Sequence, residues 1–208
     1  MLWACILLPQ LALDAVLRRC PDPDAPLALV TGPAQLRSLH AVNATAAAAG
    51  LRPGQRLVAA QALSPGFAMV EHDPAREAAA QRFLAGWAYR HSSLVSTAWP
   101  GAIVLEARAS FRLFGPWPRF ERRLREELDA LGFRHRIVLA PNPVAARALA
   151  NVHDGLAVDE AQLPACLAAL PLRRCGFDPG VAEALSRMGI EDPGAYLRPL
   201  LEAALDGS

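Results

Sequence analysis

The chain contains no lysine, and each of its 21 basic residues is an arginine. With 20 acidic residues the net charge is +1, so no overall field draws the chain toward nucleic acid or an anionic membrane. Any binding of a polyanion therefore has to be local. Arginine suits local binding because its planar guanidinium contacts phosphate through two hydrogen bonds and keeps its charge when partly buried.

Metal-ligand and disulfide patterns are absent as well. The four cysteines stand far apart, with no pair spaced for zinc: Cys5, Cys20, Cys166 and Cys175. The five histidines are scattered over different predicted elements and are expected at surface or capping positions: His40, His72, His91, His135 and His153. The sequence therefore predicts no metal site and no cofactor, in a chain from a reducing compartment.

Long hydrophobic runs are missing too. The apolar start, MLWACILLP, ends at Pro9, well short of the roughly 20 residues that a membrane-spanning helix needs, and it has no basic segment typical of a secretory signal. We therefore expect a first core strand over residues 2–8 and a helix over residues 11–19. The protein is expected to be cytoplasmic, without membrane contact.

Strand and helix patterns alternate as far as residue 151. An apolar run predicts a strand over 27–32, followed by an Ala-rich helix ending at Gly50 and a second helix ending near Pro65. The later patterns are a strand over 67–73, a helix over 74–92, two strands within 94–115, a helix over 118–132 and a strand, turn and helix over 133–151. They predict an α/β (α+β) domain whose mostly apolar sheet is covered by helices on one side. From residue 158 short helical segments predict a separate small lobe.

Three stretches, in this order, resemble the palm, fingers and thumb of Y-family (translesion) DNA polymerases. NATAAAAGLRPGQRLVAAQALSP (43–65) is similar to the fingers signature, GFRHRIVLAPNPVAARALA (132–150) to a palm segment, and LPLRRCGFDPGVAEALSRMGI (170–190) to the thumb's helix-hairpin-helix. The resemblance implies a palm-like domain over 1–9 and 68–157, a fingers-like subdomain over 10–67 and a thumb-like helical lobe over 158–208. The family's little-finger domain is expected to be absent.

The family's metal chemistry is missing at the matching positions. Two Mg²⁺ ions need oxygen ligands, which the family takes from the end of the first strand and from an adjacent acidic pair on the middle palm strand. Here Leu8 takes the first position, and Gln10 stands where a backbone-coordinating acidic residue is common. Gly101 and Ala102 replace the acidic pair. The resemblance therefore implies a fold without catalytic residues.

The nucleotide and DNA contacts of the family are reduced in the same way. Ala44 and Ala47 replace a Tyr and an Arg that contact the incoming triphosphate, while Arg147 matches a palm lysine that approaches it. Arg173 and Arg174, at the entry to the thumb hairpin, are the candidates for weak binding to the DNA backbone.

A further arginine group lies on the predicted helix over 118–132. Its glutamates are interleaved with the arginines, which favours intrahelical ion pairs over phosphate contacts: Arg119, Arg122, Arg123 and Arg125 with Glu121, Glu126 and Glu127. Trp99, Phe114 and Trp117 are expected near the face that metals would occupy, where they either fill the vacated site or form an apolar patch for a protein partner.

Loss of all these groups together resembles the ImuB-type branch of the family, as do SFRLFG (110–115) and EHDPAREA (71–78). The resemblance implies a non-catalytic adaptor in error-prone translesion synthesis during the SOS response to DNA damage. Its implied partners are an error-prone replicative-type DNA polymerase, a RecA-like accessory protein and the sliding clamp. Two alternatives stay open. One is an active Mg²⁺-dependent nucleotidyltransferase with relocated carboxylates such as Glu106 and Asp129, and the other is a stand-alone DNA-binding module.

Overall fold

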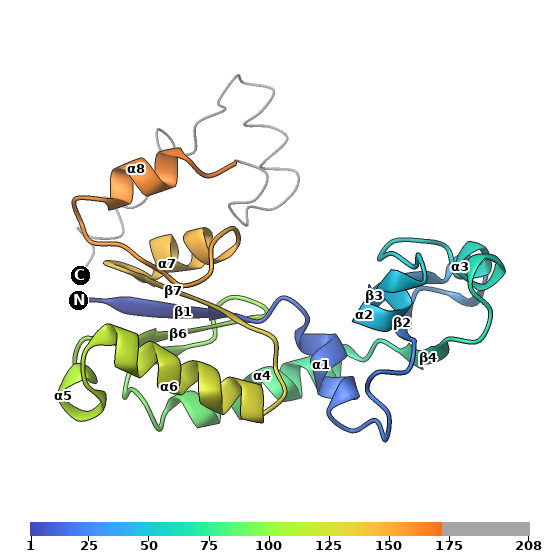
Figure 1. Cartoon of the computed structure of the whole chain (residues 1–208), viewed down its shortest axis with the longest axis horizontal. Helices are drawn as coiled ribbons and strands as arrows, with labels where there is room; N and C mark the ends of the chain where they lie inside the picture. Colours follow the sequence, from blue (N-terminus) through green and yellow to red (C-terminus); the bar gives the residue numbers. More distant parts are fainter. Residues whose placement is uncertain (172–208) are drawn as a thin grey trace. The chain divides into compact units, whose positions relative to one another are not determined.

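The computed structural model describes residues 1–171 of the 208-residue chain. They form two compact units, both discontinuous in sequence. The first unit contains Met1–Pro9, Phe83–Leu128 and the described residues from His135 onward, and the second contains Gln10–Arg82 and Asp129–Arg134. Most of the elements of both are labelled in Figure 1. The subdomain boundaries inferred from the sequence stay predictions, and the one between residues 67 and 68 falls inside the second unit.

The first unit is built on a five-stranded sheet with β1 (Trp3–Leu7) at its centre. β6 (Ala102–Glu106) and β7 (Arg136–Ala140) pair antiparallel with β1 on its two sides. The short strands β5 (Val95–Ser96) and β8 (Leu156–Ala157) form the edges, and β8 is parallel to β7. Because β1 has a neighbour on both sides and is buried on both faces, its sequence is a continuous apolar run rather than an alternation.

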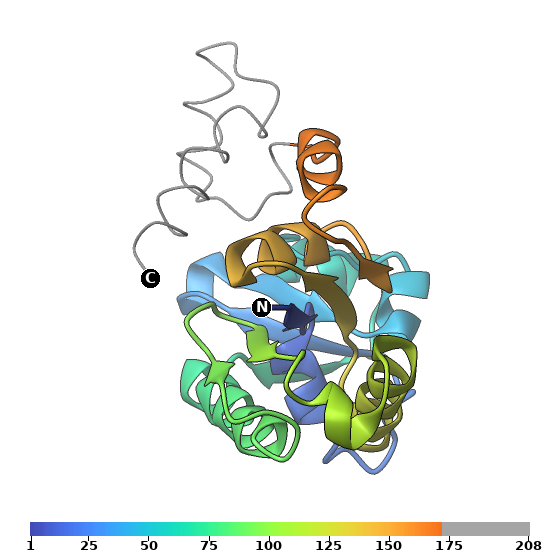
Figure 2. The same ribbon diagram turned by 90° about the vertical axis from the view of Figure 1, so that its left-hand side faces the viewer.

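Helices cover both faces of this sheet. Figure 2 shows α7 (Pro143–Ala150) on one side and α6 (Trp117–Ala130), with the end of α4 (Pro74–Ala88), on the other. The expectation of helices on one side is therefore wrong. The physical reason is that the central strands are apolar on both faces, so each face needs a cover. The second short helix on the α7 side is α8 (Leu163–Ala168), whose Leu167 joins the same core cluster as Leu149.

One predicted strand is also wrong at its end. Residues predicted as extended up to position 115 form the short helix α5 (Phe111–Phe114) instead. Phe111 and Phe114 are three residues apart, and both rings lie against Phe120 of α6, with centroids 6.4 and 5.0 Å away. A helical turn brings residues at this spacing to one face, which an extended strand cannot do.

The second unit contains a three-stranded sheet with β2 (Leu27–Thr31) in the middle. β3 (Ser38–Val42), which the sequence did not predict, is antiparallel to β2, and β4 (Ala68–Glu71) is parallel to it. The remaining elements are α1 (Leu11–Leu17), the 3₁₀ turn η1 (Ala34–Leu36), α2 (Ala44–Ala48) and α3 (Leu57–Leu63). One core lies between the sheet and α2 with α3, and another joins α1 to Leu27 and Leu29. Among residues 1–171, no helix has the length and apolar character needed to cross a bilayer.

Candidate functional site

The positions predicted for metal ligands in the first unit lie together at one end of β1 and β6. Leu7 faces Ala102 across the strand pair, and the next amide, of Leu8, donates to the carbonyl of Gly101 at 2.7 Å. The side chains of Leu8 and Ala102 are buried hydrocarbon. Since a glycine has no side chain, these three positions offer no side-chain oxygen to a hard cation such as Mg²⁺.

The backbone at this end also disfavours a returning carboxylate. Gly101 has φ +63°, a conformation that residues with a side chain rarely adopt. A Cβ atom at this position would lie 3.3 Å from the carbonyl oxygen of Leu8. Any residue with a side chain there would therefore bring both backbone strain and a close contact between its Cβ atom and this carbonyl oxygen.

Gln10, the other position compared with an acidic ligand, is engaged within the second unit. Its side-chain oxygen accepts a hydrogen bond from Arg134 at 3.0 Å. One helical turn further, the carboxylate of Asp14 accepts from the backbone amide of Arg134 at 2.8 Å. Asp14 is only 3% exposed, and this burial raises its pKa to about 6, against the smaller opposing effect of the bond from Arg134. Both side chains therefore hold Arg134 at the start of α1.

Glu106 stands at the other end of β6 from Ala102, roughly 13 Å away at about 3.3 Å per residue. It is 6% exposed, and its two carboxylate oxygens accept from the backbone amides of Arg108 and Ala109, each at 3.1 Å. This carboxylate therefore closes the turn that follows β6. Asp129, the second relocated acid considered, belongs to the second unit.

Arg147, the cation retained in the first unit, is held within its own helix. One guanidinium nitrogen donates to the side-chain oxygen of Asn151, while its Nε is buried without a partner among the described residues. The thiol of Cys5 lies near this charge. Burial raises the pKa of Cys5 to about 12, and the positive charge of Arg147 offsets part of that effect.

The positions compared with nucleotide contacts lie on α2 of the second unit. Ala44 is exposed, whereas Ala47 is partly buried against the core of that unit. The carbonyl of Ala47 accepts a hydrogen bond at 2.5 Å from the guanidinium of Arg52. Arg52 thus hydrogen-bonds a carbonyl at the end of α2, and the side chains of α2 are methyl groups and the hydroxyl-bearing Thr45.

Asn43, which opens the fingers-like motif, has a structural role. Its Oδ1 accepts from the amide of Ala46 at 3.0 Å, which caps α2, and from the amide of Leu27 at 3.1 Å. Its Nδ2 donates to the carbonyls of Pro23 and Ala25 at 3.1 and 2.7 Å. This single buried amide fixes the start of α2 to the loop before β2.

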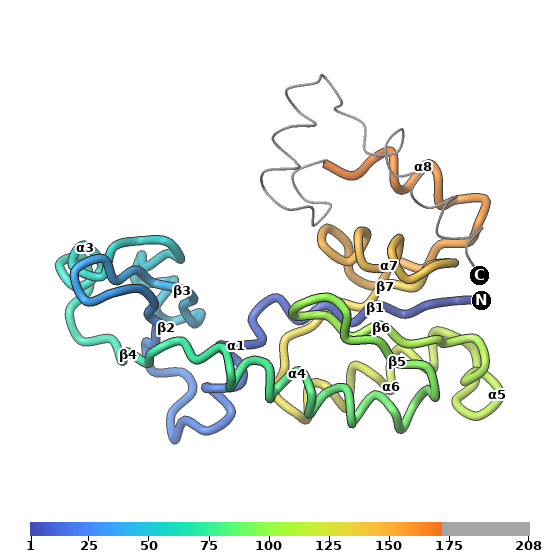
Figure 3. The backbone as a smooth tube through the Cα atoms, turned by 180° about the vertical axis from the view of Figure 1, so that it is seen from behind, coloured from blue at the N-terminus to red at the C-terminus, as the bar shows by residue number. Residues whose placement is uncertain are grey.

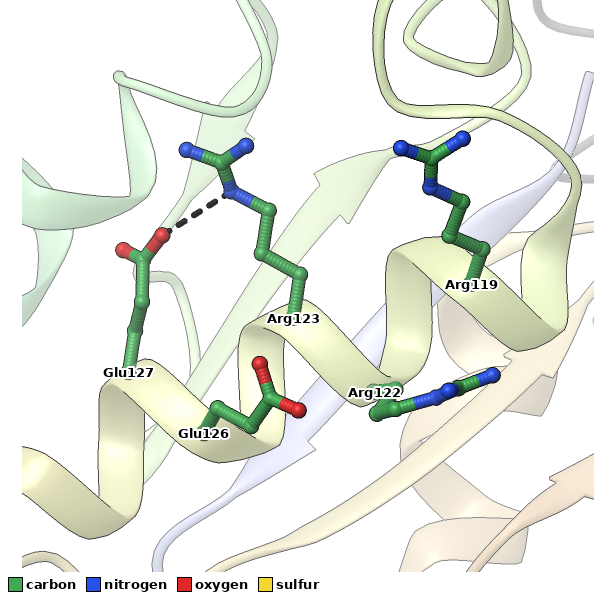
Figure 4. A pocket seen from close by; sticks show the side chains of 5 residues that line it. All are labelled: Arg119, Arg122, Arg123, Glu126 and Glu127. Carbon is green, nitrogen blue, oxygen red and sulfur yellow. Dashed lines mark hydrogen bonds and ion pairs between the residues drawn. The ribbon is translucent and has the colours of Figure 1, made fainter.

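The arginines of α6 divide into paired and unpaired members. Arg123 contacts Glu127 at 3.0 Å, while Arg125 contacts Glu121 at 2.7 Å and Asp154 at 2.6 Å. The two pairs with glutamate fit the predicted intrahelical ion pairing, whereas Asp154 lies outside α6. Figure 4 shows the shallow pocket on this helix, of about 430 Å³, with Arg119, Arg122 and Arg123 around it and Glu126 and Glu127 at one end.

Within the described part of the chain, Arg119 and Arg122 have no ion-pair partner. They are therefore the α6 cations available to an external phosphate. Arg173 and Arg174, the predicted DNA contacts, lie outside the described residues.

The three aromatic residues expected at one face lie in two different places. Trp99 packs against the core on the α7 side of the sheet, together with Val104 and Leu149. Trp117 and Phe114 instead surround Phe120 of α6, with ring centroids 6.1 and 5.0 Å from it. The expectation of one aromatic patch is wrong because residues before and after β6 pack on opposite sides of the sheet.

Behind this aromatic group, Glu127 joins α6 to the end of α4. Its carboxylate accepts from the indole nitrogen of Trp87 at 2.8 Å and lies 3.0 Å from Nε2 of the buried His91. Partial burial opposes ionisation, but these contacts and Arg123 together lower the pKa of Glu127. Burial lowers the pKa of His91 more than Glu127 raises it. This cluster is a buried structural link between the two helices.

Two histidines that the sequence placed apart are neighbours. The rings of His40 and His72 stack in the second unit, with centroids 3.9 Å apart. They lie in different segments, as expected, but β3 and β4 flank the same central strand and bring them together. The separation of the two residues along the sequence gave no signal that they meet.

The topology defines a polymerase-like α/β core. The positions at its strand ends that were predicted to match metal ligands carry no carboxylate. The fold is that of the catalytic core of Y-family DNA polymerases. A binary complex of Dbh DNA polymerase superposes with a TM-score of 0.74, at 16% identity over 97% of this chain and 60% of that chain. DinB from Sulfolobus solfataricus gives a TM-score of 0.69, at 17% identity over 95% of this chain and 60% of that one.

The chain belongs to the impB/mucB/samB family, whose model matches residues 15–151. It is 30% identical over 149 residues to Protein ImuB from two strains of Caulobacter vibrioides, NA1000 / CB15N and ATCC 19089 / CIP 103742 / CB 15. The match covers 71% of this chain and 32% of each relative. The chain therefore spans about a third of the length of the curated relatives that it matches.

Proposed function

We propose that this chain is the polymerase-like part of a non-catalytic subunit in error-prone translesion DNA synthesis, where it acts as an adaptor during the response to DNA damage. The observation that carries the proposal is the end of β1 and β6, where Leu8 and Gly101 keep their backbone hydrogen bond and the positions of Leu8, Gly101 and Ala102 offer no side-chain oxygen. Mg²⁺ gives up its hydration water reluctantly, so a pair of Mg²⁺ ions is bound only where side-chain oxygens replace that water. Selection on the fold without its ligands is expected where the fold serves contacts with other macromolecules.

The hydrogen bonds of Glu106 support a non-catalytic role over an active site with relocated carboxylates. Its oxygens already accept hydrogen bonds from two backbone amides, and it stands at the far end of β6.

The partners proposed from the resemblance are an error-prone replicative-type DNA polymerase, a RecA-like accessory protein and the sliding clamp. The similarity to Protein ImuB supports the DNA-repair context of this proposal.

Primer extension tests the absence of catalysis. The purified chain is expected to extend no primed template with Mg²⁺ or Mn²⁺, under conditions where an active Y-family polymerase does, and to show no Mg²⁺-dependent binding of deoxynucleotide by calorimetry. Extension that disappears in Glu106→Gln would favour the relocated nucleotidyltransferase instead. The adaptor role is tested by native pull-down from an extract of the source cells, where an error-prone polymerase is expected among the captured proteins.

Weak binding to the DNA backbone is the second part of the proposal. Arg119 and Arg122 on α6, and the predicted pair Arg173 and Arg174, are the competing candidates. Replacing one pair by alanine should make the dependence of log K on log salt shallower by about 1 for each phosphate that the pair neutralises. Arg82→Ala, which removes an exposed arginine elsewhere, is the matched control. A steep salt dependence without any captured polymerase would favour the stand-alone DNA-binding module.

A further inference from the structure

Two histidines and a glutamate converge beside the sheet of the second unit. His40 belongs to β3, His72 directly follows β4, and Glu77 lies in the first turn of α4. The imidazole planes are 16° apart in their stack, and Nε2 of His72 lies 2.9 Å from a carboxylate oxygen of Glu77. One possible ligand atom from each residue lies within 4.8 Å of the other two. No other group of three such side chains meets this condition within the described residues.

The strand register explains why these residues meet. β2 pairs Val30 with Leu39 and Leu29 with Ala41, so His40 is the extra residue of a bulge in β3. On the other side of β2, the amide of His72 donates to the carbonyl of Val30 at 2.8 Å. Both histidines therefore flank the same stretch of the central strand. A β-bulge changes the direction of the side chain that it carries, and bulges are frequent beside functional sites.

The third group, Glu77, follows the short connection between β4 and α4, which Figure 3 traces from the sheet into the helix. Asp73 in this connection caps α4, since its Oδ1 accepts from the amide of Ala75 at 2.9 Å. The cap fixes where the helix begins and so places Glu77 one turn later, next to His72. Backbone hydrogen bonds of β2, β4 and α4 thus set the position of two of the three groups.

We propose that His40, His72 and Glu77 bind a divalent first-row transition-metal ion, with Zn²⁺ as the ion that these donors fit best. Imidazole nitrogen and carboxylate oxygen bind Zn²⁺ at about 2.0–2.2 Å. Mg²⁺ prefers oxygen ligands alone, so this site is chemically distinct from the absent carboxylate site of the polymerase fold. Three protein ligands leave the fourth position of a tetrahedral ion to water or another ligand.

The distances between the possible ligand atoms in this structure lie on both sides of the distance expected around a bound ion. Ligand atoms around a tetrahedral Zn²⁺ lie about 3.3 Å apart, given bonds of about 2.0 Å. Here the separations run from 2.9 Å to at most 4.8 Å. The exposed His40 ring can rotate out of the stack to complete the site.

Metal titration of the whole chain tests this site. Isothermal calorimetry with Zn²⁺ alone is expected to give one ion per chain, and Co²⁺ is expected to give the visible absorption of a tetrahedral complex. His40→Ala, His72→Ala and Glu77→Gln should each weaken binding at least about tenfold. His153→Ala, which removes a histidine from the first unit, is the matched control and should leave binding unchanged.

His40→Ala is the decisive variant because this side chain is exposed and the fold should survive its loss. Zn²⁺ should raise the Tm of the wild-type chain and leave that of His40→Ala unchanged. Unchanged Zn²⁺ affinity in His40→Ala, or no binding by the wild type, would overturn the proposal. Thiolate-to-cobalt charge-transfer absorption would also overturn it, because it would place the ion on cysteines.

Discussion

Replacing Gly101 by alanine tests whether the end of β6 could again carry a side chain. The residue has φ +63°, and a Cβ atom would approach the carbonyl oxygen of Leu8 to 3.3 Å. The amide of Leu8 also holds the carbonyl of Gly101 at 2.7 Å, so neither strand end can move away without losing that bond. We expect Gly101→Ala to destabilise the first unit.

The magnitude follows from two contributions. A residue with a Cβ atom in the left-handed region costs about 1–2 kcal/mol. The approach to Leu8 adds to this, so the expected loss is about 2 kcal/mol. For a chain of this size about 1 kcal/mol corresponds to a fall in Tm of roughly 2–4 °C, which gives a fall of roughly 4–8 °C.

Two other glycines separate these contributions. Gly54 has φ +84° but no atom within 4 Å of a Cβ position, so Gly54→Ala should show the conformational cost alone. Gly86 lies inside α4 with open space around it, and Gly86→Ala should stabilise by about 0.5–1 kcal/mol. Thermal unfolding followed by circular dichroism measures all three. If Gly101→Ala unfolds no more easily than Gly54→Ala, the close approach to Leu8 does not constrain this position.

Three further predictions concern buried polar groups. The pKa of Asp14 is raised to about 6, so the folded chain holds this proton more tightly than the unfolded chain, and stability should fall by up to about 3 kcal/mol as pH rises from 4 to 7. Asp14→Asn keeps the acceptor for Arg134 and should remove that loss in urea unfolding, whereas parallel curves for both chains would contradict it. Asn43→Ala should lower the free energy of unfolding by about 2–4 kcal/mol. Asn43→Ser, which keeps a cap for α2, should lower it less. Equal losses in the two variants would exclude a separate contribution from the capping bond. Iodoacetamide should label Cys20 and Cys166 before the buried Cys5, as read by mass spectrometry, and equal rates in the native chain would refute its burial.

The elements with strong patterns could be predicted from the sequence. The apolar runs of β1, β6 and β7 and the periodic helix α6 are confirmed near their expected positions. β3 was missed because it is short and its alternation is interrupted by the bulge at His40. α5 was missed because four residues carry too little periodicity to separate a helical turn from the end of a strand.

The candidate site, too, could be predicted from the sequence only in part. Leu8, Gly101 and Ala102 were assigned from the family resemblance, and antiparallel pairing brings the three together at one end of β1 and β6; their match to the family's metal ligands stays a prediction. The structural role of Glu106 could not be predicted, since the groups that donate to it are backbone amides of a turn. The neighbourhood of His40 and His72 depends on strand order and on one bulged residue, which are properties of the folded sheet.

The central place of β1 has a consequence for synthesis on the ribosome. This apolar strand is made before both of its neighbours, which begin only at Ala102 and Arg136. At about 5–20 residues per second, both edges of β1 stay unpaired for several seconds or longer. A strand in that state can pair with other nascent chains, so yield in cells should depend on chaperone capacity and on the speed of translation before β6 emerges.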